Sequence, residues 1–128
     1  MEEAEQSQES DDAEPSISPA DCQRIERAAE KWVAAGSYRQ PNQTLTTVAN
    51  DMDVQRYMLK AWLQQTEYGK LSNWVNHLRT EEAQRVMTAH PDWGLDAVAE
   101  HCGFSLSSFH RVFHQYTGMT PAQFQRVH

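Results

Sequence analysis

Two stretches of the sequence carry side chains that could hydrogen-bond to base edges or phosphates, at spacings that a helix would gather on one face. Residues three and four apart share one side of an α-helix. Arginine and lysine bond guanine O6 and N7, glutamine bonds adenine, and serine bonds either bases or phosphates. Contact with nucleic acid is therefore the predicted chemistry, weighed against ordinary solvated helix faces. The candidates are Arg56, Tyr57, Lys60 and Gln64 in the first stretch and Ser107, Ser108, His110, Arg111 and His114 in the second.

Histidines near the end of the sequence raise a second hypothesis, a metal site. Four of them fall within residues 101–128, and His110 and His114 are spaced so that they could share a helical face. A zinc site needs three or four ligands in tetrahedral geometry. No carboxylate or second pair is placed to complete one, and Cys102 lies on the preceding predicted helix. We therefore expect no metal and no other cofactor.

The candidates lie inside a pattern that the chain repeats at an offset of fifty residues, over 45–64 and 95–114. In each copy, Leu-x-x-Val-Ala forms one helical face and three later apolar residues form another. The break between the faces contains Asp53 or Gly103, and both residue types accept the left-handed conformation of a tight turn. The pattern predicts a helix-turn-helix, twice. The recurring positions are Leu45, Val48, Ala49, Val54, Leu59, Trp62 and Leu63, then Leu95, Val98, Ala99, Phe104, Phe109, Val112 and Phe113.

Other helical architectures account for this repeat less well. An α-solenoid usually needs three or more copies, and a generic helical core would not fix the offset. In a helix-turn-helix, early residues of the second helix enter the major groove of DNA. DNA binding is the favoured interpretation, and a helical protein–protein interaction module on the same scaffold is the alternative.

Further helices are predicted on either side of the two copies. Ser18 and a following proline favour a helix over about 19–35 that ends at Gly36, and residues 37–43 are expected to form a loop. Thr44 is placed to cap the next helix. Thr120 is followed by proline and should open the last helix, whose free backbone amides we expect to hold a DNA phosphate.

A longer helix is predicted between the copies, over about 71–87. It should end before His90, because the residue before a proline is pushed out of the helical region. Glu81, Glu82 and Arg85 are expected on its solvent side. In the second helix of the first copy, Ala61 is expected to face outward with the candidate residues.

Charge is distributed unevenly along the 128 residues, and the net charge of −7 belongs to the first fifteen. The remaining chain holds 11 basic and 11 acidic groups. Residues 54–88 have a net charge of +2, and residues 101–128 contain no acidic group. The stretches with the candidate residues are thus the positive ones, although mildly so for a DNA-binding domain.

Composition limits the remaining classes. The length suits one domain or two very small ones. No apolar run is long enough to span a membrane, and no signal peptide is visible. Cys22 and Cys102 fit no zinc spacing and are expected to be reduced thiols in a cytoplasmic protein. No enzyme is expected, because the sequence lacks a phosphate-binding loop, paired carboxylates and a nucleophile with a base.

The motifs near the end of the chain resemble a known family. Gly103-Phe104, the run Phe-His-Arg-Val-Phe over 109–113 and the run Tyr-Thr-Gly-Met-Thr-Pro-Ala-Gln-Phe over 116–124 resemble the C-terminal signature of AraC/XylS-type transcription regulators. Residues 74–83, Trp-Val-Asn-His-Leu-Arg-Thr-Glu-Glu-Ala, are similar to the linker helix of that family.

The resemblance covers about residues 40–126 and implies an all-α fold of about seven helices, with a long helix joining two helix-turn-helix units. It implies a sequence-specific bacterial regulator, often an activator, that inserts two recognition helices into successive major grooves of promoter DNA and contacts RNA polymerase. Most members carry a separate sensing domain, and none is visible here, so a stand-alone member and a fragment of a longer sensor both stay open. The expected parts are a disordered acidic tail (1–18), a first unit (19–68), a linker helix (69–89) and a second unit (90–128).

Overall fold

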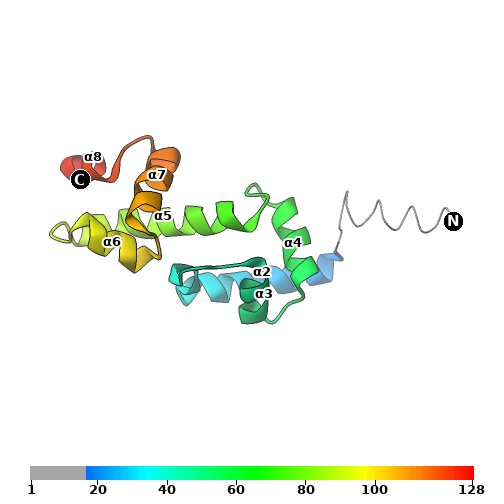
Figure 1. The fold of residues 1–128 in the computed structure, drawn as a ribbon. Helices are drawn as coiled ribbons and strands as arrows, with labels where there is room; N and C mark the ends of the chain where they lie inside the picture. Colours follow the sequence, from blue (N-terminus) through cyan, green and yellow to red (C-terminus); the bar gives the residue numbers. More distant parts are fainter. Residues whose placement is uncertain (1–16) are drawn as a thin grey trace. The chain divides into compact units, whose positions relative to one another are not determined.

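A computed structural model describes residues 17–128. All regular secondary structure in this part of the chain is helical (Figure 1). The predicted all-α class with about seven helices is confirmed. The predicted disordered tail lies outside the described residues, apart from its last two positions. No described helix is long and apolar enough to cross a membrane. The elements are α2 (Pro19–Ala34), the 3₁₀ helix η1 (Ser37–Arg39), α3 (Leu45–Met52), α4 (Arg56–Gln65), α5 (Leu71–Ala89), α6 (Leu95–Cys102), α7 (Leu106–Thr117) and α8 (Pro121–Val127).

The helices begin where capping residues satisfy their first backbone N–H groups. Ser18 Oγ accepts the N–H of Asp21 at 3.1 Å at the start of α2. At the start of α3, Thr44 accepts the backbone N–H of Thr47 at 3.1 Å in a capping box. These starts agree with the predicted ones. The loop expected over 37–43 is wrong in part, because residues 37–39 form η1.

The structure divides into two compact units, each of which is described here by itself. The first unit consists of residues 17–35 and 43–71, which hold α2, α3 and α4. The second unit consists of residues 72–128, with nearly all of α5, and of the short segment 36–42. This 36–42 segment precedes α3 in the sequence, yet its contacts are with the second unit.

The core of the first unit forms where α2, α3 and α4 pack against one another. Ile25, Val48 and Leu59 are completely buried, and Leu63 is nearly so. Trp32 is also buried, and its indole N–H donates to a carboxylate oxygen of Asp51 at 3.5 Å. The predicted apolar faces of the first copy therefore meet the helix that precedes them.

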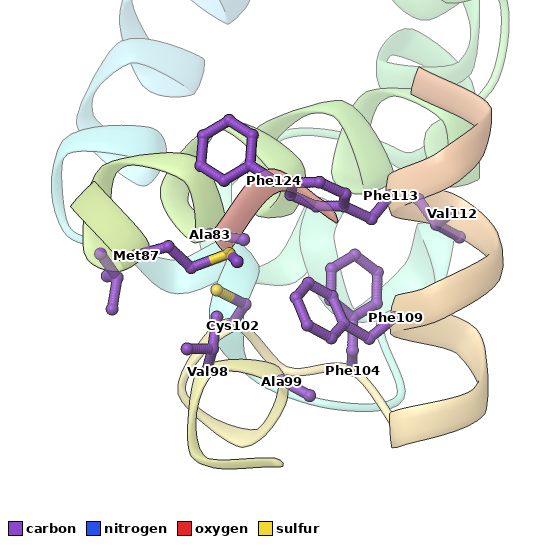
Figure 2. Close-up of a cluster of buried hydrophobic side chains, with 11 residues drawn as sticks. Ala83, Met87, Val98, Ala99, Cys102, Phe104, Phe109, Val112, Phe113 and Phe124 are labelled. Atoms are coloured by element: carbon purple, nitrogen blue, oxygen red, sulfur yellow. The ribbon is translucent and has the colours of Figure 1, made fainter. Parts of the chain in front are cut away.

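The core of the second unit is richer in aromatic side chains (Figure 2). Phe113 makes edge-to-face contacts with two other rings. The centroid of its ring lies 5.5 Å from that of Phe109 and 5.4 Å from that of Phe124. Such edge-to-face pairs contribute stability beyond the apolar area they bury. The cluster joins α5, α6, α7 and α8 through Ala83, Val86, Met87, Val98, Ala99, Cys102, Phe104, Phe109, Val112, Phe113 and Phe124.

Candidate nucleic-acid interface

The turn inside each unit has the geometry that the repeat predicts. Asp53 has φ 57° and Gly103 has φ 90°, both left-handed. In the first turn the N–H of Val54 donates to the carbonyl of Ala49 at 3.0 Å, and in the second the N–H of Phe104 donates to the carbonyl of Ala99 at 2.9 Å. This bond from the residue after the left-handed one is the mark of a Schellman motif. Two helix-turn-helix units are therefore present.

The second helix of the first unit, α4, exposes every candidate predicted on it. Arg56, Tyr57, Lys60 and Gln64 are all exposed, and Tyr57 leaves 56% of its surface open to solvent. Their spacing places them along one side of the helix. This side offers two cations, one phenol and one amide, all able to hydrogen-bond.

Ala61 does not join this exposed face, and the expectation that it points outward is wrong. Its exposed fraction is 0%. Helix α4 packs against both α2 and α3, so a wider sector of it is covered than the apolar stripe alone suggests. Arg24 of α2 lies 3.4 Å from the sulfur of Met58, and Ala61 follows Met58 by three residues on the same side.

The second helix of the second unit, α7, exposes four of its five candidates. Ser107, His110, Arg111 and His114 are exposed along three turns. Ser108 is half-buried, and its backbone N–H donates to the capping Ser105 Oγ at 3.2 Å. Leu106, the first residue of α7, is also exposed, at 46%.

Thr120, the remaining candidate, is half-buried and works as the cap of α8. Its hydroxyl oxygen accepts the backbone N–H of Gln123 at 3.1 Å, and its own N–H donates to Gln123 Oε1 at 2.9 Å. Pro121 has no N–H to offer. The expected set of free amides at this helix start is therefore wrong in part, because the capping box uses those of Thr120 and Gln123.

The 36–42 segment contacts the turn of the second unit, an arrangement that sequence patterns did not reveal. Arg79 donates from Nε to the carbonyl of Tyr38 at 2.8 Å and from Nη2 to the carbonyl of Gln40 at 2.7 Å. Its guanidinium lies 5.6 Å from the centre of the Phe104 ring. The Arg39 carbonyl lies so close to Gly103 that a Cβ at this position would collide with it. The segment thus lies against the turn and leaves room at position 103 for glycine alone.

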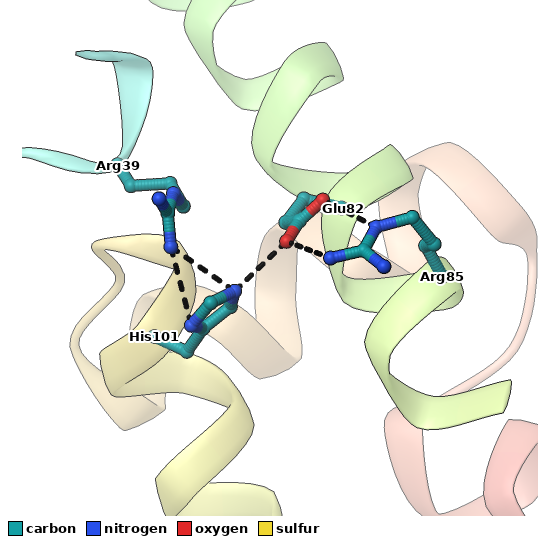
Figure 3. A network of polar contacts seen from close by, with 4 residues as sticks. All are labelled: Arg39, Glu82, Arg85 and His101. Atoms are coloured by element: carbon teal, nitrogen blue, oxygen red, sulfur yellow. Dashed lines mark hydrogen bonds and ion pairs between the residues drawn. The ribbon is translucent and has the colours of Figure 1, made fainter. Parts of the chain in front are cut away.

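A polar network continues from this segment across α6 to α5 (Figure 3). Arg39 Nη1 lies 3.2 Å from His101 Nε2, which lies 2.8 Å from Glu82 Oε2. Arg85 donates to both oxygens of Glu82, at 2.9 and 2.7 Å. The hydrogen bonds from Arg85 lower the pKa of Glu82 to about 2, although partial burial acts the other way. The expectation that Glu82 faces solvent is wrong, since only 11% of its side chain is exposed.

A groove of about 440 Å³ lies beside this network, within the second unit. Its walls come from the 36–42 segment, α5, the turn and the first part of α7. Arg111 and Ser108 line it together with Glu100, so cationic, hydroxyl and acidic groups all face the space. Within residues 17–128, no three His, Cys, Asp or Glu side chains gather as a metal site would require.

The two cysteines lie on α2 and α6, one in each unit. Both are free thiols. Cys102 is completely buried in the core of the second unit, and burial raises its pKa to about 12. A thiol in this environment is protonated and unreactive.

Fold and exposed surface together define a class, a domain with two helix-turn-helix units of the kind that transcription regulators use to bind DNA. Residues 89–126 match the family model of bacterial regulatory helix-turn-helix proteins, AraC family. This match confirms the resemblance seen in the sequence for residues 89–126, which form a helix-turn-helix unit of the AraC family.

Individual relatives agree with this assignment. Over 90 residues, the chain is 36% identical to the uncharacterized transcriptional regulatory protein YesN of Bacillus subtilis (strain 168). The aligned region covers 67% of this chain and 24% of YesN. The chain thus spans about a quarter of that relative's length.

Solved structures are similar in fold. The C-terminal domain of AraT, a response regulator from Geobacillus stearothermophilus, superposes with a TM-score of 0.70 at 23% identity, covering 88% of both chains. A DNA-binding transcriptional dual regulator from Escherichia coli K-12 gives a TM-score of 0.67 at 25% identity, covering 88% of this chain and 95% of that one.

Proposed function

We propose that this chain binds double-stranded promoter DNA in a sequence-specific manner and serves as the DNA-binding part of a cytoplasmic transcription regulator. The observation that carries the proposal is the pair of exposed faces on α4 and α7. Each follows a helix-turn-helix turn, and each presents hydrogen-bonding and cationic side chains where a recognition helix meets base edges. The two helices would enter successive major grooves.

The exposed side chains divide by the contact that each would make. Arg111 is the best candidate for a bidentate bond to guanine, and Gln64 suits adenine. Arg56 and Lys60 can bind either a guanine edge or phosphates, the latter fixing the register of the protein on the duplex. In the second unit, Ser107, His110 and His114 add polar contacts along the same side of α7.

The test is selection from a library of genomic DNA fragments across a series of salt concentrations. We compare the unmodified chain with a double variant, Lys60→Ala with Arg111→Ala. A charge-matched control, Arg27→Ala with Lys31→Ala, removes two exposed cations of α2 instead. The chain should enrich a shared sequence, with affinity falling steeply as salt rises.

The two double variants should then behave differently. Loss of both recognition-helix cations should lower affinity by about a hundredfold or more, since each bidentate base contact contributes roughly 1–3 kcal/mol. The control should keep the selected sequence. Failure of the unmodified, folded chain to enrich any sequence at low salt would overturn DNA binding and favour the protein-interaction alternative.

Activation of transcription and contact with RNA polymerase belong to the same proposal, supported by the match of residues 89–126 to the AraC family model. A separate sensing domain, which the family usually carries, is also proposed as a partner. Transcription with purified RNA polymerase from a template carrying the selected sequence would distinguish an activator from a repressor. Output should rise with the unmodified chain and not with the Lys60→Ala, Arg111→Ala variant.

A further inference from the structure

Large apolar side chains are exposed at four positions of residues 17–128, and two of these lie at the start of the second helix of their unit. Tyr116 hydrogen-bonds from its hydroxyl to the carbonyl of Asn73 at 3.1 Å, and Val127 is the last residue of α8. Tyr57 and Leu106 remain, and both lie in the first turn of the second helix of their unit. A recognition helix contacts bases with this turn.

The surroundings of Leu106 limit what could cover it. Ser105 and Ser108 on either side are engaged with each other through the capping bond. Ser107, His110 and Arg111 are exposed beside it. The apolar surface is therefore a single side chain within a polar and cationic face. A protein partner would need a much larger contiguous apolar patch, since specific interfaces bury on the order of 1,600 Å².

The major groove of DNA offers one apolar group of matching size. Of all the groups on base edges there, only the C5-methyl group of thymine is apolar, and the others donate or accept hydrogen bonds. A leucine opposite guanine, adenine or cytosine edges would leave those donors and acceptors without partners, which is unfavourable. Contact with a methyl group removes apolar surface of both partners from water.

We propose that Leu106 contacts the methyl group of a thymine and so sets a base preference in the half-site bound by the second unit. The inference rests on the proposed DNA binding and adds to it a specificity-determining residue. Arg111, which is also exposed on α7, would contact a base of the same half-site. Leu106 thus discriminates by apolar contact, whereas Arg111 discriminates by hydrogen bonds.

The experiment uses the DNA sequence selected above and removes single methyl groups from it. The half-site of the second unit is identified first. Base substitutions there lower the affinity of the unmodified chain but not that of Arg111→Ala. Each thymine of that half-site is replaced in turn by deoxyuridine, which lacks only the methyl. One replacement should lower the affinity of the unmodified chain about fourfold, as expected for one methyl returned to water.

Two variants make the result specific. Leu106→Ala should bind thymine and deoxyuridine DNA equally, because the side chain that meets the methyl is gone. Tyr57→Ala, which removes the exposed large side chain in the first turn of α4, should keep the full effect. Both positions are exposed, so both variants should unfold at the same urea concentration as the unmodified chain.

The outcomes separate the two proposals. If the chain selects a sequence but no deoxyuridine replacement lowers its affinity, or if the loss persists in Leu106→Ala, the thymine contact is wrong and DNA binding stands. If the half-site of the second unit contains no thymine, the thymine contact is likewise wrong. If no sequence is selected at all, DNA binding itself fails and the thymine contact fails with it.

Discussion

The first unit turns at Asp53 and the second at Gly103, with the same left-handed backbone and the same hydrogen bond closing the turn. The surroundings differ. Gly103 lies against the Arg39 carbonyl of the 36–42 segment, where no Cβ could fit, whereas Asp53 is exposed. The second turn is therefore also held by a segment from elsewhere in the sequence, whereas the residue that turns in the first unit faces solvent.

The exposed faces differ in a corresponding way. Arg56 and Lys60 of α4 match Leu106 and His110 of α7 at the offset of fifty, and the buried Ala61 matches the exposed Arg111. The first unit thus has cations at the first and fifth residues of α4, while the second has its one cation at the sixth residue of α7. The shared scaffold sets where a side chain is presented, and the residue there sets which group of DNA it suits.

The largest expected effect tests the contact with the 36–42 segment at Gly103. Gly103→Ala should lower the free energy of unfolding of the second unit by about 3 kcal/mol, from left-handed strain plus the collision with the Arg39 carbonyl. Gly118→Ala is the control, since Gly118 is also left-handed at φ 77° but nothing lies within 4 Å of its Cβ position. That variant should cost about 1 kcal/mol.

Hydrogen exchange measured helix by helix would follow both variants. Amides of α6 and α7 should lose protection in Gly103→Ala, and those of α3 and α4 much less. Equal losses in Gly103→Ala and Gly118→Ala would mean that the collision with the carbonyl relaxes at no cost. The asymmetry between the two turns would then be only one of residue type.

A smaller effect is expected from removing the bonds that hold the 36–42 segment. Arg79→Met keeps most of the apolar stem but deletes the two bonds to the carbonyls of Tyr38 and Gln40. Hydrogen bonds from a charged donor contribute about 1.5–3 kcal/mol, and part is regained as water reaches the freed carbonyls, so we expect a loss of about 2 kcal/mol. Urea unfolding would measure it, with the exposed Arg27→Met as control, where the change should stay within about 0.5 kcal/mol. A loss no larger than the control's would mean that the segment holds without Arg79.

The contrast between the units also separates what the sequence could predict from what it could not. The repeat, both turns and the capping at Ser18 and Thr44 follow from local patterns, because spacing and cap chemistry act within a few residues. The 36–42 segment joins the second unit through contacts about forty residues apart, from Arg79 to backbone carbonyls. Backbone carbonyls are present at every residue, so no sequence signal marks them as partners.

The candidate residues show the same division. The exposed sides of α4 and α7 followed from helical spacing, whereas Ala61 and Glu82 were misplaced. A small or charged side chain shows no sign of burial in a periodic pattern when a second helix or a polar partner covers it. The outward position of Leu106 also follows from helical spacing, but a leucine side chain forms no hydrogen bond to a base edge, so the candidates chosen for hydrogen bonding did not include it.

The smallest effect concerns Glu82, which bonds to His101 of α6 and to Arg85 of α5 within the second unit. The folded pKa of Glu82, about 2, lies below its ordinary value of 4.5. Its contribution to stability is therefore complete above about pH 4.5 and is lost as the pH falls towards 2. We expect a loss of about 1–2 kcal/mol over this window, less than the shift alone gives, because its partner Arg85 is largely exposed. Urea unfolding at a series of pH values should show this acid weakening shrink in Glu82→Gln and persist in Glu81→Gln, whose carboxylate is 63% exposed. An identical acid response in both variants would assign the weakening to other carboxylates and remove Glu82 from the contrast between the units.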